Sequence, residues 1–477
     1  MDFITYEMFG AAGDGITDDM PAIIQAHEEA NRLSLPVKAK EGAVYYIAPK
    51  NYTAIVKTSV DWTGAKFIID DRACEKHTAA LFMVLGDKEP VELEISSLHR
   101  GQTEIPNPFG KELYVVVKNA NYKDYIRKGL NQNNGTARTD NFILHADGTL
   151  PSPVSFDFDE ITGVHAVPVD ETRLTLTGGE FTTIANQWES RYDYHARNIA
   201  VRRSNVDIGG ITHLVTGELD HGAPYSGFLS ISGCAHVCVH DCVFTGHKIY
   251  STIGAAGKPV SMGSYDIGLG MCSDISLLRC SQTTDILDRG YWGLIGSNYC
   301  RDLLLEDCHF SRFDAHQGVT NCTLRRCTLG WQCLNAIGSG TFLIEETDAY
   351  GHALVNLRSD YGSTWNGTMV IRNCTWRPLG QGRAVFAGWN DATHDFGYDC
   401  YLPQNVVIDG LTILEERTDD APLYIFNNYL GNAEISAEER KYMPIPPVSV
   451  DVKNVHTHRP VVLCEQPELM TDTVFHI

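Results

Sequence analysis

The sequence predicts an all-β protein built as a right-handed parallel β-helix (solenoid), with a helix near its N-terminus and an inserted β-rich subdomain. Three observations predict this fold. One strand pattern, often with a cysteine at a fixed position, recurs along the second half of the chain. A glycine-rich turn and a helical pattern open the chain. Between about residues 86 and 175 the recurring pattern is absent, and other strand patterns replace it.

The recurring pattern reads apolar, any residue, apolar, two mostly polar residues, and then a small or apolar residue. Short strands of this kind cannot bury their apolar faces alone, but stacking them turn upon turn buries them. The sixth positions should then form one buried column. Its cysteines are expected to be free thiols, because cysteine packs in cores as a small apolar residue and no C-x-x-C pair occurs. The sixth positions are Ser204, Cys242, Cys280, Cys308, Cys327, Thr347, Cys374, Leu411 and Val455.

The N-terminal stretch YEMFGAAGDGITDDMPAIIQAHEEA contains a strand, a glycine-rich turn and a helix pattern. Thr17 or Asp18 is expected to cap the helix, since short polar side chains accept hydrogen bonds from the first free amides. Pro21 is tolerated in the first turn. Apolar residues at helical spacing predict the buried face of this helix. They are Ile23, Ala26 and Ala30.

The same passage resembles the opening of the pectate-lyase-like superfamily of right-handed parallel β-helix proteins, whose signature FGAxGDGxTDD is matched by FGAAGDGITDD. The resemblance implies that the helix caps the open end of the solenoid. The resemblance indicates the fold but not the reaction, because the superfamily includes polysaccharide lyases, glycoside hydrolases, epimerases and phage tailspikes.

The patterns divide the chain into three parts. Residues 1–85 hold the N-terminal capping helix and the first coils, 86–175 the inserted subdomain, and 176–477 the main β-helix with its active-site loops. Segments such as KELYVVVKN and PVSFDFDEI, with turn signals NNG and ADG, predict antiparallel strands in the middle part. This subdomain is expected to lie on the early coils.

Composition narrows the classes of partner. The net charge is −22, from 38 basic and 60 acidic residues, which argues against nucleic acid or an anionic membrane as the main partner. No run of 18 apolar residues is present, so no membrane span is expected. The start MDFITYEMFG lacks the features of a secretory signal, so a cytoplasmic location is expected. Removal of a leader would instead indicate a secreted protein.

The stretch SRFDAHQG carries Arg312, Asp314 and His316 at every second position, so an extended strand would place them on one face. Counting each coil from its column cysteine puts Asp285 and Asp288 of the preceding coil beside them. Neighbouring strands lie about 4.8 Å apart, so one of these two aspartates is expected within contact range of Asp314 and His316.

Two carboxylates on adjacent coils suit glycoside hydrolysis, which needs them roughly 5–5.5 Å apart for retention and 6.5–9.5 Å apart for inversion. The leading prediction is therefore a glycoside hydrolase that cleaves an oligo- or polysaccharide. One carboxyl would have a raised pKa and act as the acid, while an arginine keeps its partner ionised. The catalytic candidates are Asp285, Asp288, Asp314 and His316.

The long loop 246–268 is expected to form a wall of the binding cleft, since insertions in solenoids often gather on a binding face. Aromatic residues nearby offer flat surfaces for sugar rings. The substrate-binding candidates are His247, Lys248, Tyr265, Asp266, Arg289, Trp292, Arg312 and His352. Another polar cluster, His394, Asp395 and Asp399, is better explained as loop structure.

Two other functions stay open. The resemblance admits a polysaccharide lyase acting on a uronate-containing glycan, with Arg289 or Arg312 as base and calcium held by Asp285 and Asp288. It also admits a non-catalytic, tailspike-like glycan-binding protein. No metal site or cofactor is expected for the hydrolase. The expected partner is an oligo- or polysaccharide, with a homo-oligomer left open.

Overall fold

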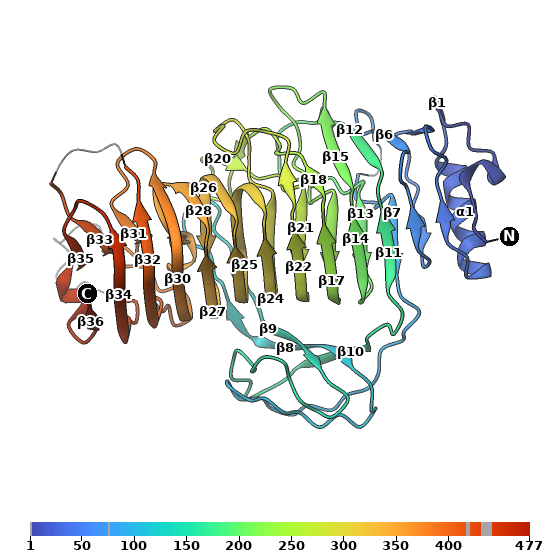
Figure 1. Ribbon diagram of the computed structural model, residues 1–477. Coiled ribbons are helices and arrows are strands. Elements are labelled where there is room, and N and C mark those ends of the chain that lie inside the picture. Colours follow the sequence, from blue (N-terminus) through green and yellow to red (C-terminus); the bar gives the residue numbers. More distant parts are fainter. Residues whose placement is uncertain (1, 75–76, 416–419, 431–440) are drawn as a thin grey trace.

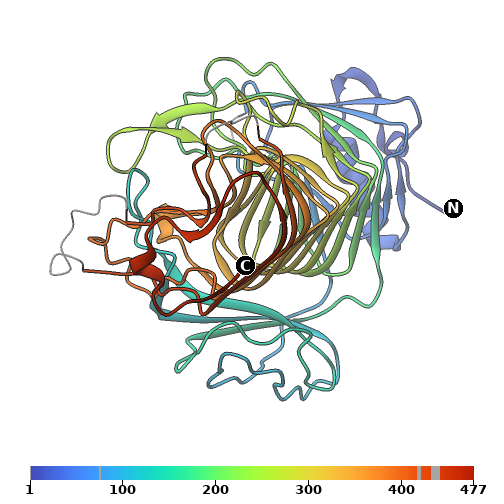
Figure 2. The ribbon, with the colours of Figure 1, turned by 60° about the vertical axis from the view of Figure 1, so that its left-hand side comes forward.

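The computed structural model describes residues 2–74, 77–415, 420–430 and 441–477, and it confirms the predicted parallel β-helix. Of the described strands, 31 join into one sheet that winds along the molecule. Figure 1 shows the coils stacked side by side, and Figure 2 looks more nearly along their axis. The pairing of strands between coils divides this winding sheet into three parallel faces.

Along the chain, each strand of the first face except the earliest follows a strand of the third face, after a bend, a turn or a longer connection. It comprises β2 (Val37–Lys38), β5 (Val60–Asp61), β11 (Leu174–Thr177), β14 (Val206–Gly209), β17 (Ala235–His240), β22 (Ser273–Leu278), the end of β24 (Ile295–Glu306), the end of β25 (His309–Arg325), β27 (Gly338–Glu345), β30 (Trp365–Pro378), β32 (Asn405–Ile413), β34 (Ser449–His456) and β36 (Val474–His476).

The second and third faces complete each coil. The second comprises β1 (Asp14–Asp18), β3 (Val44–Ile47), β6 (Lys66–Asp70), β12 (Glu180–Ile184), β15 (Thr212–Thr216), β18 (Val243–Phe244), β23 (Ser281–Gln282), the start of β25, β26 (Thr328–Ala336), β28 (Asp348–Gly351) and the end of β30. The third comprises β4 (Ala54–Val56), β7 (Phe82–Leu85), β13 (Ile199–Arg202), β16 (Leu229–Ser232), β21 (Ile267–Gly270), the start of β24, the middle of β25, the end of β26, β29 (Ala353–Leu357), β31 (Ala384–Ala387), β33 (Leu423–Phe426) and β35 (Val461–Cys464).

The predicted cysteine column lies at the bend between the first and second faces. The strand register confirms it from Cys242 onward, and its five cysteines are buried free thiols. The residue before each cysteine turns the chain with a left-handed backbone, with φ of 54° at Asp307. Each thiol donates to backbone carbonyls, as Cys308 does to Leu277 at 3.3 Å.

The prediction for the first column position was wrong. Val206 pairs with Val237, so Ile211 and not Ser204 lies beside Cys242. The segments IAVRRSNV and VDIGGITH both fit the pattern, and only the second contains the bend between the faces. Ser204 lies before β14 and is buried, with its hydroxyl accepting a hydrogen bond from the backbone amide of Ala235.

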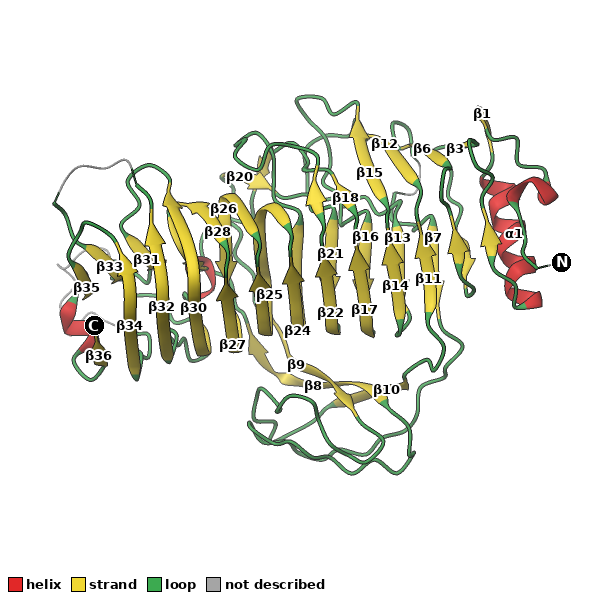
Figure 3. Ribbon diagram, in the orientation of Figure 1, coloured by secondary structure: helices red, strands yellow, loops and turns green. Residues whose placement is uncertain are grey.

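The N-terminal helix α1 (Met20–Leu33) packs against β4 and closes the N-terminal end of the solenoid (Figure 3). Its predicted apolar face, Ile23, Ala26 and Ala30, is fully buried. The predicted cap was wrong, because the helix starts after Asp19. The Asp19 carboxylate accepts hydrogen bonds from the amides of Ala12 and Gly13 and thereby holds the glycine-rich turn against the helix.

The inserted region forms an antiparallel sheet, as predicted, in the order β10 (Gly163–Pro168), β8 (Leu113–Asp124), β9 (Thr136–Leu144). It packs against the middle coils, although it was expected on the early ones. Arg301 of β24, 1% exposed, pairs with Asp140 of β9 at 2.9 Å. The Tyr114 hydroxyl of β8 donates to the carbonyl of Met271.

The remaining elements are short. A hairpin of β19 (Tyr250–Ile253) and β20 (Pro259–Met262) projects from the long loop of the main helix. Three 3₁₀ turns are η1 (Tyr6–Phe9), η2 (Ser359–Tyr361) and η3 (Pro467–Met470). Among the described residues, no helix has the length and apolar character needed to cross a membrane.

Candidate functional site

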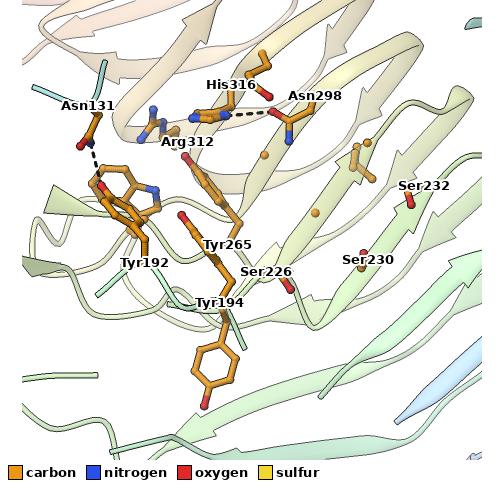
Figure 4. Close-up of a pocket in the computed structure, with 18 of the residues that line it drawn as sticks. Asn131, Tyr192, Tyr194, Ser226, Ser230, Ser232, Tyr265, Asn298, Arg312 and His316 are labelled. Atoms are coloured by element: carbon orange, nitrogen blue, oxygen red, sulfur yellow. Dashed lines mark hydrogen bonds between the residues drawn. The ribbon is translucent and has the colours of Figure 1, made fainter. Parts of the chain in front are cut away.

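A pocket of about 670 Å³ opens on the outer side of the third face (Figure 4). The floor of the pocket is formed by three consecutive coils, in which outward-facing small residues alternate with buried apolar ones. Ser230, Gly268 and Gly296 lie in register on the outside, while the apolar residues before them point into the core. Since these positions carry little or no side chain, other segments can approach the sheet closely: a Cβ atom at Gly268 would lie 2.5 Å from the carbonyl oxygen of Ser226, and one at Gly296 would lie 3.3 Å from the Tyr265 ring.

Aromatic rings and segments from outside the solenoid wall this floor. Tyr192, Tyr194, Tyr265 and Trp292 line the pocket, together with residues of the β19–β20 hairpin. The strap, defined here as residues 127–131 between β8 and β9, brings the inserted subdomain to the same pocket through Arg127 and Asn131. The insertion therefore contributes directly to the site.

The stretch SRFDAHQG continues the floor into the next coil. Phe313 and Ala315 are fully buried in the core, and Asp314 pairs in register with Gly296. Arg312, Asp314 and His316 therefore share the outer face, as their alternation predicted. Arg312 and His316 line the pocket (Figure 4), whereas Asp314 is fully buried and does not line it.

Asp314 has no exposed surface and is surrounded by partners. Arg312 lies 2.7 Å from its carboxylate and Arg358 lies 3.2 Å away, while the Tyr265 hydroxyl donates to it. Burial alone would raise the pKa of this carboxyl, but the two guanidinium groups lower it to about 2. Asp314 is therefore ionised near neutral pH and fixes the positions of both arginines.

His316 and Tyr265 are two titratable side chains of the pocket, which Tyr192, Tyr194 and Tyr225 also line. Burial and the nearby Arg358 lower the pKa of His316 to about 4, so its ring is neutral at pH 7. Its Nδ1 donates to Asn298 Oδ1 at 3.1 Å, which leaves Nε2 as the acceptor. Burial and the charge of Asp314 raise the pKa of Tyr265, which keeps its hydroxyl protonated.

Arg358 belongs to the site although the sequence analysis did not select it. It pairs with Asp360, which also holds Arg127 at 2.6 Å. A signal was present, because RSD at 358–360 repeats the Arg-x-Asp spacing of RFD at 312–314. A second signal was the repeated small residues of LSIS and IGLG, which could have indicated the floor of the pocket.

The predicted contact of Asp285 or Asp288 with Asp314 does not form. Ile295 pairs with Phe313, so residues 283–294 leave the sheet as a loop. Both aspartates and Arg289 are exposed on this loop and do not line the pocket. Each aspartate accepts a hydrogen bond from a backbone amide two residues later. The count from the column cysteine failed because a loop follows the column in this coil, whereas β25 continues without a break to Asp314 in the next.

The other predicted binding residues do not gather in one place. Trp292 lines the pocket, with its ring centroid 4.9 Å from the Arg312 guanidinium. His247 and Asp266 are buried next to the pocket and pair with each other at 3.2 Å. The Lys248 ammonium donates to the carbonyl of Glu218. His352 is exposed and does not line this pocket.

The His247–Asp266 pair is part of a buried polar network. Asp266 also binds His213 at 2.7 Å, and Glu218 binds the second ring nitrogen of His247. Burial would lower the pKa of His247, but the two carboxylates raise it to about 10. This network fixes the backbone beside Tyr265. No group of three or more His, Cys, Asp or Glu residues suited to a metal ion occurs in the described part of the chain.

Comparison with solved structures agrees with this fold. The chain is similar to the tailspike gp49 of Pseudomonas phage LKA1, with 12% identity, a TM-score of 0.59, and coverage of 99% of this chain and 84% of that one. It is also similar to the phage phi297 tailspike gp61 (13% identity, TM-score 0.57, coverage 96% and 81%). A third similar structure is the Gp54 tailspike of Acinetobacter baumannii bacteriophage AP22 in complex with capsular saccharide (11% identity, TM-score 0.52, coverage 99% and 79%).

These likenesses show the fold. No protein-family model matches the chain, and no curated protein matches it.

Proposed function

We propose that this protein is a carbohydrate-active enzyme whose pocket binds an acidic, uronate-containing glycan and cleaves it by β-elimination. The charge of the pocket lining carries the proposal. Arg127, Arg312 and Arg358 line it, and no Asp or Glu is among its described lining residues. Arginine presents planar donors that match a carboxylate. The aromatic walls offer apolar surface to sugar rings.

The comparisons support a glycan ligand. The AP22 tailspike was solved with a capsular saccharide, and the FGAAGDGITDD resemblance includes polysaccharide lyases. Neither observation bears on which bond is broken, so the reaction is inferred from the chemistry of the pocket alone.

β-Elimination removes the proton on the carbon next to a uronate carboxylate. The adjacent ring carbon then loses its bond to the glycosidic oxygen, and a double bond forms between the two carbons. Arg312 or Arg358 would hold the carboxylate and stabilise the negative charge that develops on it. Neutral His316 suits the base that takes the proton. The Tyr265 hydroxyl already donates to Asp314, so the proton that His316 takes would pass on to the leaving oxygen.

Hydrolysis by paired aspartates, the leading prediction from the sequence, has less support in this geometry. Asp285 and Asp288 lie outside the pocket lining, and Asp314 is ionised between two arginines. An inverting or retaining pair needs two carboxyl groups facing one glycosidic bond. The described residues also offer no grouping suited to calcium, so no step is assigned to that ion.

Incubation with alginate and with polygalacturonate tests the proposal. Absorbance at about 235 nm should rise together with reducing ends, because β-elimination leaves a conjugated double bond. The His316→Ala variant should lose about 10²-fold or more of this rate, while the exposed Asp288→Asn variant keeps it. Reducing ends without the absorbance would instead favour the hydrolase. Binding without either signal would favour the non-catalytic, tailspike-like alternative.

A further inference from the structure

A second pocket of about 560 Å³ adjoins the first. The two share the lining residues Arg127, Asn131 and Ser261, so they meet at the strap. The second pocket is also lined by Pro259 of the hairpin, by Asp360 and by residues of the loop that follows β31, including Asp391. Both carboxylates have partners, since Asp360 pairs with Arg127 and Arg358 and Asp391 pairs with His394. The function proposed above makes no use of this pocket.

The strap is held from several sides. The Lys128 amide donates to the carbonyl of Asp360 at 2.9 Å, and the Ala256 amide donates to the carbonyl of Leu130 at 3.0 Å. The Asn131 side chain donates to the Tyr192 hydroxyl at 2.9 Å, as Figure 4 shows. A Cβ atom at Gly254 would lie 2.5 Å from the Asn131 side-chain oxygen, so the hairpin approaches the strap closely. The boundary between the pockets is thus a fixed feature of the fold.

Trp389 presents a large aromatic surface to the second pocket. Its side chain is 49% exposed, and an exposed tryptophan contributes little to the core. Its backbone is nevertheless held firmly, since its amide donates to Ser363 Oγ at 2.9 Å and its carbonyl accepts from the same hydroxyl at 3.2 Å. The fold therefore fixes the backbone from which this indole ring extends at the pocket wall.

Polar groups without protein partners lie beside this ring. The Asn390 side chain is 1% exposed, and its amide nitrogen has no hydrogen-bond partner within the described residues. Lys128 also lines this pocket, and its ammonium forms no ion pair within the described residues. A sugar ring has an apolar C–H face and an edge of hydroxyl groups. The indole ring of Trp389 can stack on the C–H face, and the Asn390 and Lys128 donors can bind the hydroxyl groups.

We propose that the two pockets form one groove for consecutive sugars of a glycan chain, with Trp389 stacking on a sugar beyond the strap. The inference rests on the proposed function in taking an acidic glycan as the ligand. It adds that the substrate is a chain long enough to occupy both pockets, and that short fragments fill only the first.

Titration calorimetry with oligomannuronates and oligogalacturonates, from the disaccharide to the octasaccharide, tests this. All proteins carry His316→Ala so that the chains stay intact. The affinity should rise with length in the parent. Trp389→Ala should weaken the octasaccharide about five- to tenfold and leave the disaccharide unchanged. Phe109→Ala removes another aromatic ring, 36% exposed and outside both pockets, and should change neither.

The outcomes separate the two proposals. Equal affinity of parent and Trp389→Ala for the octasaccharide overturns the groove. If Arg312→Ala then still weakens every length, the glycan site in the first pocket stands without the second. Failure of both oligosaccharide series to bind overturns the groove and the proposed uronate ligand together.

Discussion

Asp314 shows how one residue can organise a site without facing the ligand. It is buried beneath the pocket and balances Arg312 and Arg358, which reach the pocket themselves. Two guanidinium groups held this close would repel each other without an anion between them. The carboxylate therefore acts as a positioning group, and its negative charge is the property that matters.

Replacement of Asp314 by asparagine should remove that charge and leave the arginines uncompensated. We expect the free energy of unfolding to fall by about 3 kcal/mol and uronate cleavage to fall about 10²-fold. Urea unfolding and the 235 nm assay measure the two effects. Asp288→Asn, at an exposed loop position, should stay within about 0.5 kcal/mol of the parent. Full activity of Asp314→Asn would contradict this role.

The lowered pKa of Asp314 also predicts a dependence of stability on pH. Because the folded pKa of about 2 is below the unfolded value near 3.9, its contribution is complete above the unfolded value and is lost as pH falls through about 2. Urea unfolding of parent and Asp314→Asn from about pH 5 to about pH 2 should show their difference shrinking with acidity. A difference that stays constant over this range would show that the charge is unimportant.

Strand β25 links the main features at the scale of elements. Its start lies beside the cysteine column, its middle carries Arg312, Asp314 and His316, and its end contacts the inserted subdomain through Thr320. The column itself works by hydrogen bonding as well as by packing. At Thr347 a hydroxyl takes the place of the thiol and donates to the carbonyl of Glu345 at 2.9 Å.

Cys308→Ser should accordingly be tolerated. A serine hydroxyl can donate to the carbonyls of Leu277 and Glu306 that the thiol contacts now, so we expect a loss of at most about 1.5 kcal/mol in the free energy of unfolding. Cys308→Ala keeps no donor and leaves a small cavity, so it should cost at least as much. Chemical denaturation ranks the two variants, and a much larger loss for serine would contradict the hydrogen-bonding role.

The distinction between features within one strand and features between strands explains what could be predicted from the sequence. The column from Cys242 onward and the alternation of SRFDAHQG depend on neighbouring residues within one strand, so both were predicted correctly. The position of Asp285 depends on how many residues leave the sheet between two strands, and the pattern contains no measure of that number. The strap was beyond prediction because it reaches the pocket from another sheet, between β8 and β9. Arg358 was within reach, through its repeated Arg-x-Asp spacing.

At the scale of the whole molecule, the inserted subdomain lines both pockets of the proposed binding site. It docks on the coils through the buried pair of Arg301 and Asp140, and its strap lines both pockets. Arg301 also donates to the carbonyl of Pro153, so a single side chain connects the coil to two segments of the subdomain. Docking and ligand binding are therefore expected to depend on each other.

Arg301→Met tests that dependence, because Arg301 itself does not line either pocket. The variant leaves Asp140 buried without its partner, which should destabilise the docked state by about 3–5 kcal/mol. We expect faster hydrogen exchange in the strap and weaker glycan binding. The double variant Arg301→Met with Asp140→Leu removes both charges and should recover part of the loss. Unchanged binding in the single variant would show that the strap holds its position without the pair.

The reach of the subdomain along the solenoid changes how the protein should unfold. Stacked repeats are coupled chiefly to their nearest neighbours, so a bare solenoid can fray from one end. Here the subdomain bonds to His236 in β17 through Glu112 and to the carbonyl of Asn366 in β30 through Arg100. Coils that are far apart in the stack thus share one partner. The middle of the molecule should open as a single cooperative unit, while the coils from β32 onward exchange their amide hydrogens independently.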